Sequence, residues 1–282
     1  MANESSATRR RTRVSVAGWY LLLTWLSLII LFPVWMTIVR ALSEPFIYIE
    51  EGQPLYPVSI DWGVFSTAWS DGDLGRSMAL TLLVTAIITV FQLVTSVLAA
   101  YSFAFVRFPF KNTLFVVLLA SLLLPVEVTL IANVRTIREL GWLDSAQGLS
   151  APFLASAFGI FLIRQGFLGV PSELRDAARI DGFGHFAFLR RVAIPVNRPI
   201  IASFTLITAL AAWNQYLWPR TATTQERWET IQVTLRSISV QRPERFNVGV
   251  AAAIIASLPI LALLVVFQRQ IIRGLTAGAV KG

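Results

Sequence analysis

The sequence predicts an all-α membrane protein with six transmembrane helices. Of its 282 residues, 55% are hydrophobic and only 14% are charged, and the mean hydropathy is +0.65. Soluble domains are about 45–50% apolar and about 25% charged, so a soluble or disordered fold is disfavoured. A helix needs about 20 apolar residues to cross the hydrocarbon core of a bilayer. Six runs approach or exceed that length: Val16–Val39, Ser77–Phe105, Asn112–Val134, Leu149–Phe167, Pro199–Trp218 and Val248–Gln268.

The basic residues are divided unequally between the two sides that these six runs define. The side of the N-terminus carries fifteen Lys and Arg with four acidic residues, whereas the other side carries nine with twelve. Because cytoplasmic loops of membrane proteins are enriched in Lys and Arg, we predict that both termini are cytoplasmic. The net charge of +8 therefore indicates membrane topology, and no nucleic acid is expected as a partner.

The same runs predict the organisation of the chain. A disordered cytoplasmic tail over 1–15 precedes the first transmembrane helix at 16–39, and an extracytoplasmic loop follows at 40–76 with a short amphipathic helix around Ile60–Trp69. The membrane core at 77–270 contains a polar loop at 171–195 and is followed by a cytoplasmic tail at 271–282. Aromatic rings near the ends of the runs are typical of the membrane interface: Trp19, Tyr20, Trp35, Trp213, Tyr216 and Trp218.

Covalent chemistry has little support in the sequence. The chain has no Cys and one His, which excludes thiolate metal sites and cysteine nucleophiles and removes most histidine-based chemistry. Neither the phosphate-binding pattern G-x-x-x-x-G-K-[ST] nor H-E-x-x-H or G-x-S-x-G occurs. We therefore predict that the chain is not an enzyme and binds no metal or cofactor of its own.

A charged segment lies between the fourth and fifth apolar runs. Residues 173–195 hold four Arg, three carboxylates and the only His. The pattern predicts an interfacial helix over Ser172–Ile180 with Ser172 as its N-cap, then a glycine turn and a second helix over His185–Val192. Two interpretations remain: the segment contacts a cytoplasmic partner, or it is a solvated loop that only joins two spans.

The order of residues in this segment resembles a known signature. Asp176-Ala177-Ala178, then Gly182, then Val192-Ala193-Ile194-Pro195 is similar to the E-A-A…G…I-x-L-P pattern of permease subunits of bacterial ABC importers, with three conservative departures. The resemblance implies the type I (MetI-like) importer fold, in which this loop docks as a coupling helix into a cytoplasmic ATPase. The coupling residues it implies are Glu173, Asp176, Ala177, Ala178, Asp181, Gly182 and Pro195.

Further strings narrow the resemblance to the carbohydrate-type branch. The C-terminal residues 273–282 resemble the usual ending of its second permease. Residues 124–128 (LPVEV) and 213–219 (WNQYLWP) are similar to the second permease of glycerol-3-phosphate importers. The implied solute is glycerol-3-phosphate or a glycerophosphodiester such as glycerophosphocholine. Because sugar permeases share W-N-x-[FY]-x-x-P patterns, a neutral sugar such as a disaccharide or maltodextrin is the alternative.

Glu127 is the one clear acid within an apolar run. An ionisable side chain there is costly unless it is paired or in contact with water. It either lines a cavity or gate, or it is a structural partner of an Arg or of amides freed by Pro125. Asn133 and Gln92 are weaker candidates, because such residues more often form interhelical hydrogen bonds. The predicted translocation pathway comprises Glu127, Asn133, Trp213, Asn214, Gln215 and Tyr216.

The resemblance also implies partners. They are a second permease, two copies of an ATPase that holds ATP and Mg, an extracytoplasmic solute-binding protein and the bilayer of a bacterial inner membrane. An ion-coupled secondary transporter is the rival from another class, with Glu127 as its ion site and no ATPase. The loop signature has no role in such a carrier. A membrane-anchored scaffold is a third interpretation.

Overall fold

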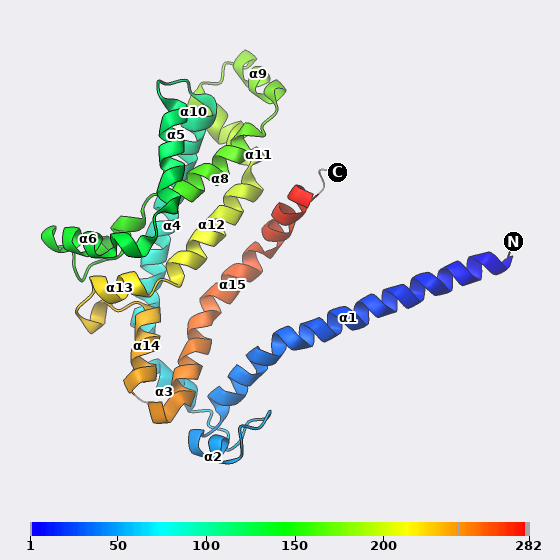
Figure 1. Ribbon diagram of the computed structural model, residues 1–282, viewed down its shortest axis with the longest axis vertical. Helices are drawn as coiled ribbons and strands as arrows, with labels where there is room; N and C mark the ends of the chain where they lie inside the picture. The colour runs from blue at the N-terminus through cyan, green and yellow to red at the C-terminus, as the bar shows by residue number, and fades with distance from the viewer. Residues whose placement is uncertain (1, 242, 280–282) are drawn as a thin grey trace. The chain divides into compact units, whose positions relative to one another are not determined.

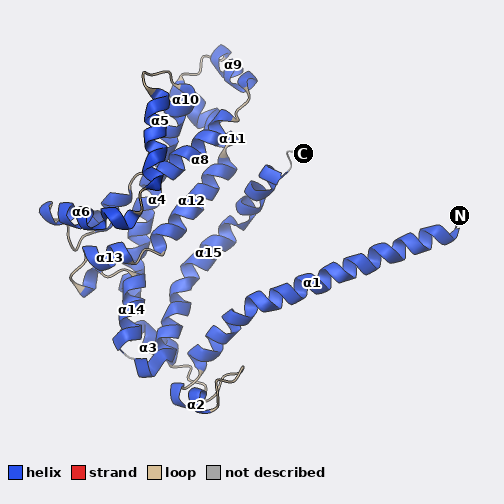
Figure 2. Cartoon of the chain, in the orientation of Figure 1, coloured by secondary structure: helices blue, strands red, loops and turns tan. Residues whose placement is uncertain are grey.

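The computed structural model describes residues 2–241 and 243–279, with side chains for 18–125, 127–241 and 243–268. Over this part of the chain the secondary structure consists of helices and loops without strands (Figure 2), which confirms the all-α prediction. Contacts within the chain divide it into two units. The first unit comprises the chain up to Gly72 together with Ile238–Ile255, and the second comprises Asp73–Ser237 and the residues from Ala256 on.

The first unit is built around a small apolar cluster. Val39, Tyr48 and Val58 are buried there, and Phe246 packs against them. The Arg40 guanidinium lies over the Phe246 ring, 5.2 Å from its centroid. The helices of this unit are α1 (Ala2–Leu42), α2 (Pro45–Glu50), α3 (Val64–Asp71), the end of α14 (Ile231–Gln241), η5 (Pro243–Arg245) and the start of α15 (Phe246–Ala279).

Both ends of the chain are more helical than the sequence predicts. Helix α1 begins at Ala2, where a disordered tail over 1–15 was expected; Met1 lies outside the described residues. No Pro or Gly occurs before Gly18, so nothing in that stretch interrupts the helical backbone. Helix α15 continues to Ala279, into the predicted tail 271–282, whose last three residues lie outside the described part.

The second unit is a helical bundle in which α8 and α12 pack against α4 (Figure 1). A single wide, π-type turn joins α10 to α11. In chain order its elements are α4 (Leu74–Phe105), α5 (Lys111–Ala120), η1 (Ser121–Leu123), α6 (Val126–Glu139), α7 (Ala146–Ser150), η2 (Ala151–Phe153), α8 (Ala157–Leu168), α9 (Ser172–Ile180), α10 (His185–Phe188), η3 (Leu189–Ala193), α11 (Ile194–Val196), α12 (Arg198–Trp213), α13 (Leu217–Ala222) and η4 (Glu226–Trp228).

Within the part of the chain that the structure describes, three helices are long and apolar enough to cross a membrane, and three bent pairs raise the number to six if each pair is one span. The long helices are Gly18–Leu42, Leu74–Phe105 and Pro243–Gln268. The bent pairs are Lys111–Leu123 with Glu127–Glu139 at 99°, Ala146–Phe153 with Ala157–Leu168 at 49°, and His185–Val196 with Arg198–Trp213 at 81°. The breaks of the first two pairs lie inside the predicted runs Asn112–Val134 and Leu149–Phe167, whereas the 81° bend lies before the run Pro199–Trp218.

Proline chemistry explains the sharpest of these bends. Leu124 is extended (φ −83°, ψ 116°) because the ring of Pro125 disfavours helical geometry in the residue before it. Pro125 also has no backbone N–H to continue the hydrogen bonds of the preceding turn. A new helix, α6, starts at Val126 in another direction. This break brings Glu127 into the first turn of α6 instead of the middle of a straight span.

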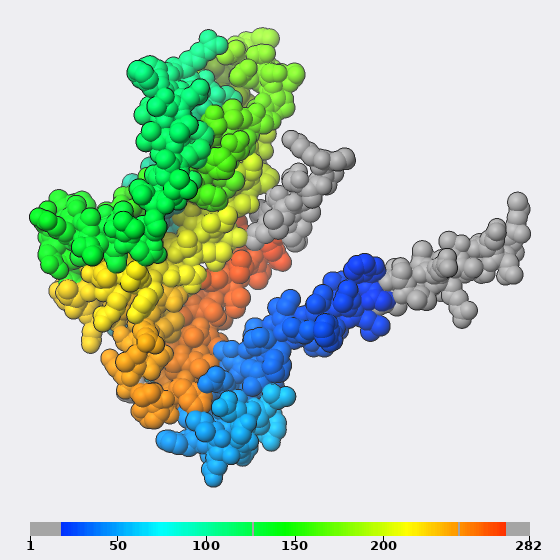
Figure 3. Space-filling view, in the orientation of Figure 1, coloured from blue at the N-terminus to red at the C-terminus, as the bar shows by residue number. Residues whose placement is uncertain are grey.

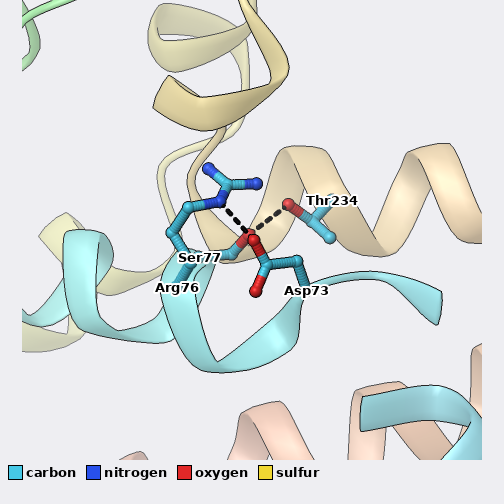
Figure 4. A network of polar contacts seen from close by, with 4 residues as sticks. All are labelled: Asp73, Arg76, Ser77 and Thr234. Carbon is cyan, nitrogen blue, oxygen red and sulfur yellow. Dashed lines mark hydrogen bonds and ion pairs between the residues drawn. The ribbon is translucent and has the colours of Figure 1, made fainter. Parts of the chain in front are cut away.

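The first turns of α4 are attached to α14 by buried hydroxyl groups (Figure 4). The Ser77 and Thr234 hydroxyl oxygens are 2.8 Å apart, and Ser77 is fully buried. One turn later, Thr81 Oγ1 accepts a hydrogen bond from the Ile231 N–H at 2.8 Å. Arg76 is ion-paired with Asp73 beside them, with Nε 2.7 Å from the carboxylate. These contacts fix the end of the second unit opposite the polar loop.

Close packing of α8 against α4 and α12 depends on Gly159. A Cβ at this position would overlap the ring of Phe204 and lie 2.5 Å from Ser96 Oγ. Overpacking a core typically costs about 1–3 kcal/mol. We expect Gly159→Leu to lower the melting temperature of the detergent-solubilised protein by several degrees. Gly18→Leu is the matched control, because a Cβ at Gly18 meets nothing within 4 Å. Equal melting temperatures for the two variants would contradict this packing.

Candidate translocation cavity and coupling helix

A cavity of about 450 Å³ opens within the second unit. It is bounded by α4, α6, the break before α8, α12 and the segment 215–218. Four of the six predicted pathway residues line it: Glu127, Asn133, Gln215 and Tyr216. The remaining lining is mostly apolar, with aromatic rings from Phe153, Phe158, Phe204 and Trp218. A mostly apolar cavity with a few polar groups is the usual form of a small-molecule site.

Glu127 supplies the charge of this cavity. Of the described residues that line it, only Glu127 is charged at neutral pH. Glu127, Leu130 and Asn133 follow one another at intervals of three residues, so they share one face of α6. Glu127 makes no ion pair with any side chain that the structure describes. The geometry thus favours the cavity-lining interpretation of Glu127 over that of a structural partner to an Arg.

Of the predicted pathway residues at the end of α12 and directly after it, not all line the cavity. Gln215 lines the cavity, and its buried Oε1 has no hydrogen-bond partner there. Trp213 and Asn214, by contrast, do not line it. Trp213 is buried at 4% exposure, and Asn214 is exposed with its Nδ2 donating to the Leu210 carbonyl at 2.8 Å. Helix α12 ends at Trp213, and the place of Trp213 and Asn214 in the pathway stays a prediction.

Trp218 lies in the interior of the second unit, contrary to the prediction. The sequence favoured a position in an interfacial belt, but Trp218 is only 4% exposed. Its indole Nε1 donates to the carbonyls of Gly148 and Leu149 at 3.2 and 3.1 Å. The ring therefore supports one wall of the cavity. Trp213 is buried as well, so neither of these rings forms an interfacial belt.

Polar side chains of α4 donate hydrogen bonds to backbone carbonyl groups at the break that precedes α8. Gln92 Nε2 donates to the Phe153 carbonyl at 2.7 Å, and Thr95 Oγ1 donates to the Leu154 carbonyl at 3.1 Å. Gln92 Oε1 also accepts from Thr208 of α12 at 3.3 Å. The interhelical role expected for Gln92 is confirmed. Asn133 differs, because its Nδ2 contacts Thr129 Oγ1 in its own helix at 3.4 Å.

The polar loop contains the predicted interfacial helix. Helix α9 spans Ser172–Ile180, as expected, but Pro171 occupies the N-cap position and Ser172 is the first helical residue. Ser172 is therefore not the N-cap. Proline suits this place because its missing N–H would be unsatisfied in any case. In Figure 3 this segment, coloured light green, lies on the surface of the second unit.

The two faces of α9 are chemically different. Ala178 is 5% exposed and belongs to a cluster with Tyr101, Phe167 and Phe188, so it attaches α9 to the bundle. Its side chain packs against the bundle, and its predicted contact with a partner stays a prediction. Ile180, by contrast, is 87% exposed. Ile180 was not among the predicted coupling residues. Those that lie on the exposed surface are Glu173, Asp176, Ala177, Asp181 and Gly182.

The turn after α9 has a defined geometry. The Gly182 and Phe183 amides donate to the carbonyls of Arg179 and Ala178 at 3.0 and 2.8 Å, and Gly182 has a φ of 74°. This is the left-handed conformation that glycine supplies at helix C-termini. Pro195 is half-buried in α11, after the wide turn of η3. Pro195 is thus part of the connection to the bundle and not of the exposed surface.

Comparison with known proteins identifies the family. Residues 92–277, more than half of the chain, match the family described as binding-protein-dependent transport system inner membrane component. The chain belongs to this family. It is a permease subunit of an ABC importer. The permease is 35% identical over 257 residues to the sn-glycerol-3-phosphate transport system permease protein UgpE of Rhizobium meliloti (strain 1021), with 88% of this chain and 91% of that protein covered.

Other similar proteins agree. UgpE of Agrobacterium fabrum (strain C58 / ATCC 33970) is 36% identical over 204 residues, which cover 72% of each chain. A solved bacterial ABC transporter involved in the import of the acidic polysaccharide alginate contains a chain that superposes on the permease with a TM-score of 0.77. The two chains are 24% identical, and the match covers 92% of the permease and 97% of the other chain. At this identity the likeness supports the fold alone.

Asp144 joins two loop segments of the permease that are distant in sequence. Its carboxylate accepts hydrogen bonds from the Thr224 amide at 2.7 Å, the Thr224 hydroxyl at 2.6 Å and the Gln225 amide at 3.1 Å. Burial raises the pKa of Asp144, but these hydrogen bonds and the nearby Arg227 outweigh burial and leave the pKa below its ordinary value. The ionised carboxylate is therefore the form that stabilises this connection.

The lowered pKa predicts a pH-dependent contribution to stability. Its stabilisation is complete above the ordinary carboxyl pKa of 3.8 and is lost as the pH falls through the lower folded-state value. Asp144→Asn is expected to melt at a lower temperature than the parent at neutral pH, with the difference shrinking below pH ~4. Asn tolerates the positive φ of 52° at this position, so the substitution tests the charge. Melting curves against pH check this, and a pH-independent difference would contradict it.

Proposed function

We propose that this permease is the second membrane subunit of an importer that carries glycerol-3-phosphate or glycerophosphodiesters such as glycerophosphocholine. The single observation that carries the proposal is the set of relatives: the UgpE proteins are 35% and 36% identical to the chain, and their names specify glycerol-3-phosphate transport. The 450 Å³ cavity of the bundle has room for a solute of this size.

The cavity chemistry supports particular roles for its residues. A bare phosphate would be repelled by Glu127, so this carboxylate is proposed to accept hydrogen bonds from glycerol hydroxyls or to attract a cationic head group. Gln215, whose Oε1 lacks a partner, is proposed to bind a hydroxyl. Aromatic rings such as Tyr216 can hold a quaternary ammonium by cation–π attraction. A neutral sugar is the second candidate, because amide and aromatic groups also suit it and none of the described lining residues is Lys or Arg.

The proposal includes the rest of the assembly. A second permease, two ATPase subunits and an extracytoplasmic solute-binding protein act with this chain, which catalyses no covalent step. ATP and Mg bind to the ATPase. Both termini are cytoplasmic, an orientation supported by the excess of Lys and Arg on that side.

The exposed surface of α9 is the proposed coupling surface. Ile180 and the neighbouring carboxylates Glu173 and Asp176 would contact the ATPase, while Ala178 holds the helix to the bundle. Closure of the ATPase pair then moves α9, and the packed cluster around Ala178 transmits that movement to α4 and α8. The cavity would open alternately to the two sides of the membrane. A secondary carrier would not require this surface.

The substrate assignment is tested by uptake into proteoliposomes. The complete assembly, with internal ATP and external binding protein, is offered labelled glycerol-3-phosphate, glycerophosphocholine and maltose in parallel. We expect ATP-dependent uptake of at least one of the two glycerol compounds and none of maltose. Uptake of maltose alone would support the neutral-sugar candidate instead. Uptake driven by an ion gradient in vesicles without the ATPase would contradict the importer mechanism itself.

A further inference from the structure

A second cavity, of about 230 Å³, lies beneath the inner face of α9. Tyr101 and Phe105 from the end of α4 form one side of it, Arg175 and Arg179 from α9 form another, and His185 of α10 completes it. These residues come from three helices of the second unit. Arg175, Ala178 and Arg179 share one face of α9, so this face is turned away from the exposed side that carries Ile180.

The polar lining of this cavity is basic. Arg175 and Arg179 are positively charged, and none of the described residues that line the cavity is acidic. Arg179 contacts Asp176 outside the lining, with Nη1 3.6 Å from the carboxylate, and both side chains are largely exposed. The Tyr101 hydroxyl and His185 Nδ1 are 2.9 Å apart and satisfy each other. The Arg191 guanidinium lies over the Phe183 ring, 5.2 Å from its centroid, and Arg191 does not line the cavity.

Arg175 is the group in this cavity that lacks a partner. Its Nε is buried without a hydrogen bond, and it forms no ion pair with a described side chain. A buried donor without an acceptor is costly, and native proteins usually satisfy such groups. The planar guanidinium presents its donors in a fork that matches phosphate oxygens. The cavity thus combines an unpaired Arg, a second Arg and space for a small group.

We infer that this cavity binds a phosphate group, held by Arg175 with Arg179 beside it. The phosphate belongs either to a small soluble anion or to a phospholipid head group, because both present the same oxygens to the guanidinium. Bound phosphate would join the inner face of α9 to α4 and α10 and would stabilise this end of the bundle. The inference concerns α9 and does not depend on which solute the importer carries.

The test uses the complete assembly in a detergent that contains no phosphate group, because phosphatidylcholine would itself offer a phosphate, and the readout is the melting temperature. In the first arm inorganic phosphate is titrated at constant ionic strength, and in the second arm phosphatidylglycerol is added to the detergent micelles. Both arms are run on the parent, on Arg175→Gln and on Arg190→Gln. Arg190 is the matched control, because it is exposed nearby in η3 and does not line the cavity.

We expect a saturable rise in melting temperature for the parent and for Arg190→Gln in at least one arm. For Arg175→Gln the phosphate concentration at half-effect should be at least about tenfold higher, or the lipid effect should be absent. A response to phosphate alone identifies a soluble anion, and a response to phosphatidylglycerol alone identifies a lipid head group. If Arg175→Gln does not assemble, Arg175→Lys replaces it. Equal responses of all variants, or no response in either arm, would overturn the inference.

Discussion

Gly182→Val is expected to reduce ATP-driven uptake by about tenfold or more while leaving the permease inserted and assembled with its partners. Gly182 has a φ of 74°, and a Cβ there would meet nothing within 4 Å, so the effect comes from backbone conformation and not from a clash. A β-branched residue is disfavoured at positive φ, and the turn must open to accommodate it. Opening this turn redirects α9, which the coupling mechanism requires to be held rigidly.

Gly184→Val is the matched control for this prediction. Gly184 is extended, with φ −72° and ψ 173°, and has the same free space around it. Valine favours that conformation, so uptake should remain near the parent level. The measurement is uptake by proteoliposomes together with the amount of ATPase that copurifies. Normal uptake by Gly182→Val would show that coupling does not require a rigid turn after α9.

Glu127→Gln is expected to change solute preference, because it removes the charge of the cavity and keeps the shape of the side chain. The apparent KM for glycerol-3-phosphate should fall, since a repulsion disappears, and that for glycerophosphocholine should rise. The attraction between partly exposed charges predicts changes of about twofold to fivefold. The measurement is the concentration dependence of uptake for both solutes with the same binding protein.

Glu139→Gln serves as the control for this charge. Glu139 lies on the same helix, is ion-paired with Arg135 at 2.8 Å and does not line the cavity. Its substitution should leave both KM values unchanged. If Glu127→Gln also leaves uptake of every solute unchanged, Glu127 has a structural role and the cavity assignment of this residue is wrong.

The features that sequence reasoning predicted well depend on local chemistry. The limits of α9 follow from Pro171 before it and the glycine turn after it, and both limits agree with the structure. Glu127 stands out because a charge in an apolar run needs water or a partner. Pro125 predicted a break in the helix. The 99° angle of that break could not be predicted, because the direction of α6 is set by the helices on which it packs.

The features that sequence reasoning missed depend on contacts between distant segments. Ala177 and Ala178 look alike in the sequence, yet Ala178 is buried and its neighbour is exposed, since only packing decides which face of α9 turns inward. Trp218 is of a residue type that is common at the membrane interface. Its indole N–H nevertheless donates to the carbonyls of Gly148 and Leu149, about 70 positions earlier in the chain. The Asp144–Thr224 contact, 80 residues apart, has no local signal either.

The central claim, that the exposed face of α9 contacts the ATPase, can be tested directly because the chain has no cysteine. Ile180→Cys is treated with a thiol reagent in the complete assembly and in an assembly stripped of the ATPase. Glu51→Cys, at an exposed position directly after α2, is the accessible control, and Ala178→Cys is the buried one. We expect the thiol of Ile180→Cys to be modified only when the ATPase is absent. Rapid modification at equal rates in both preparations would contradict a contact between α9 and the ATPase.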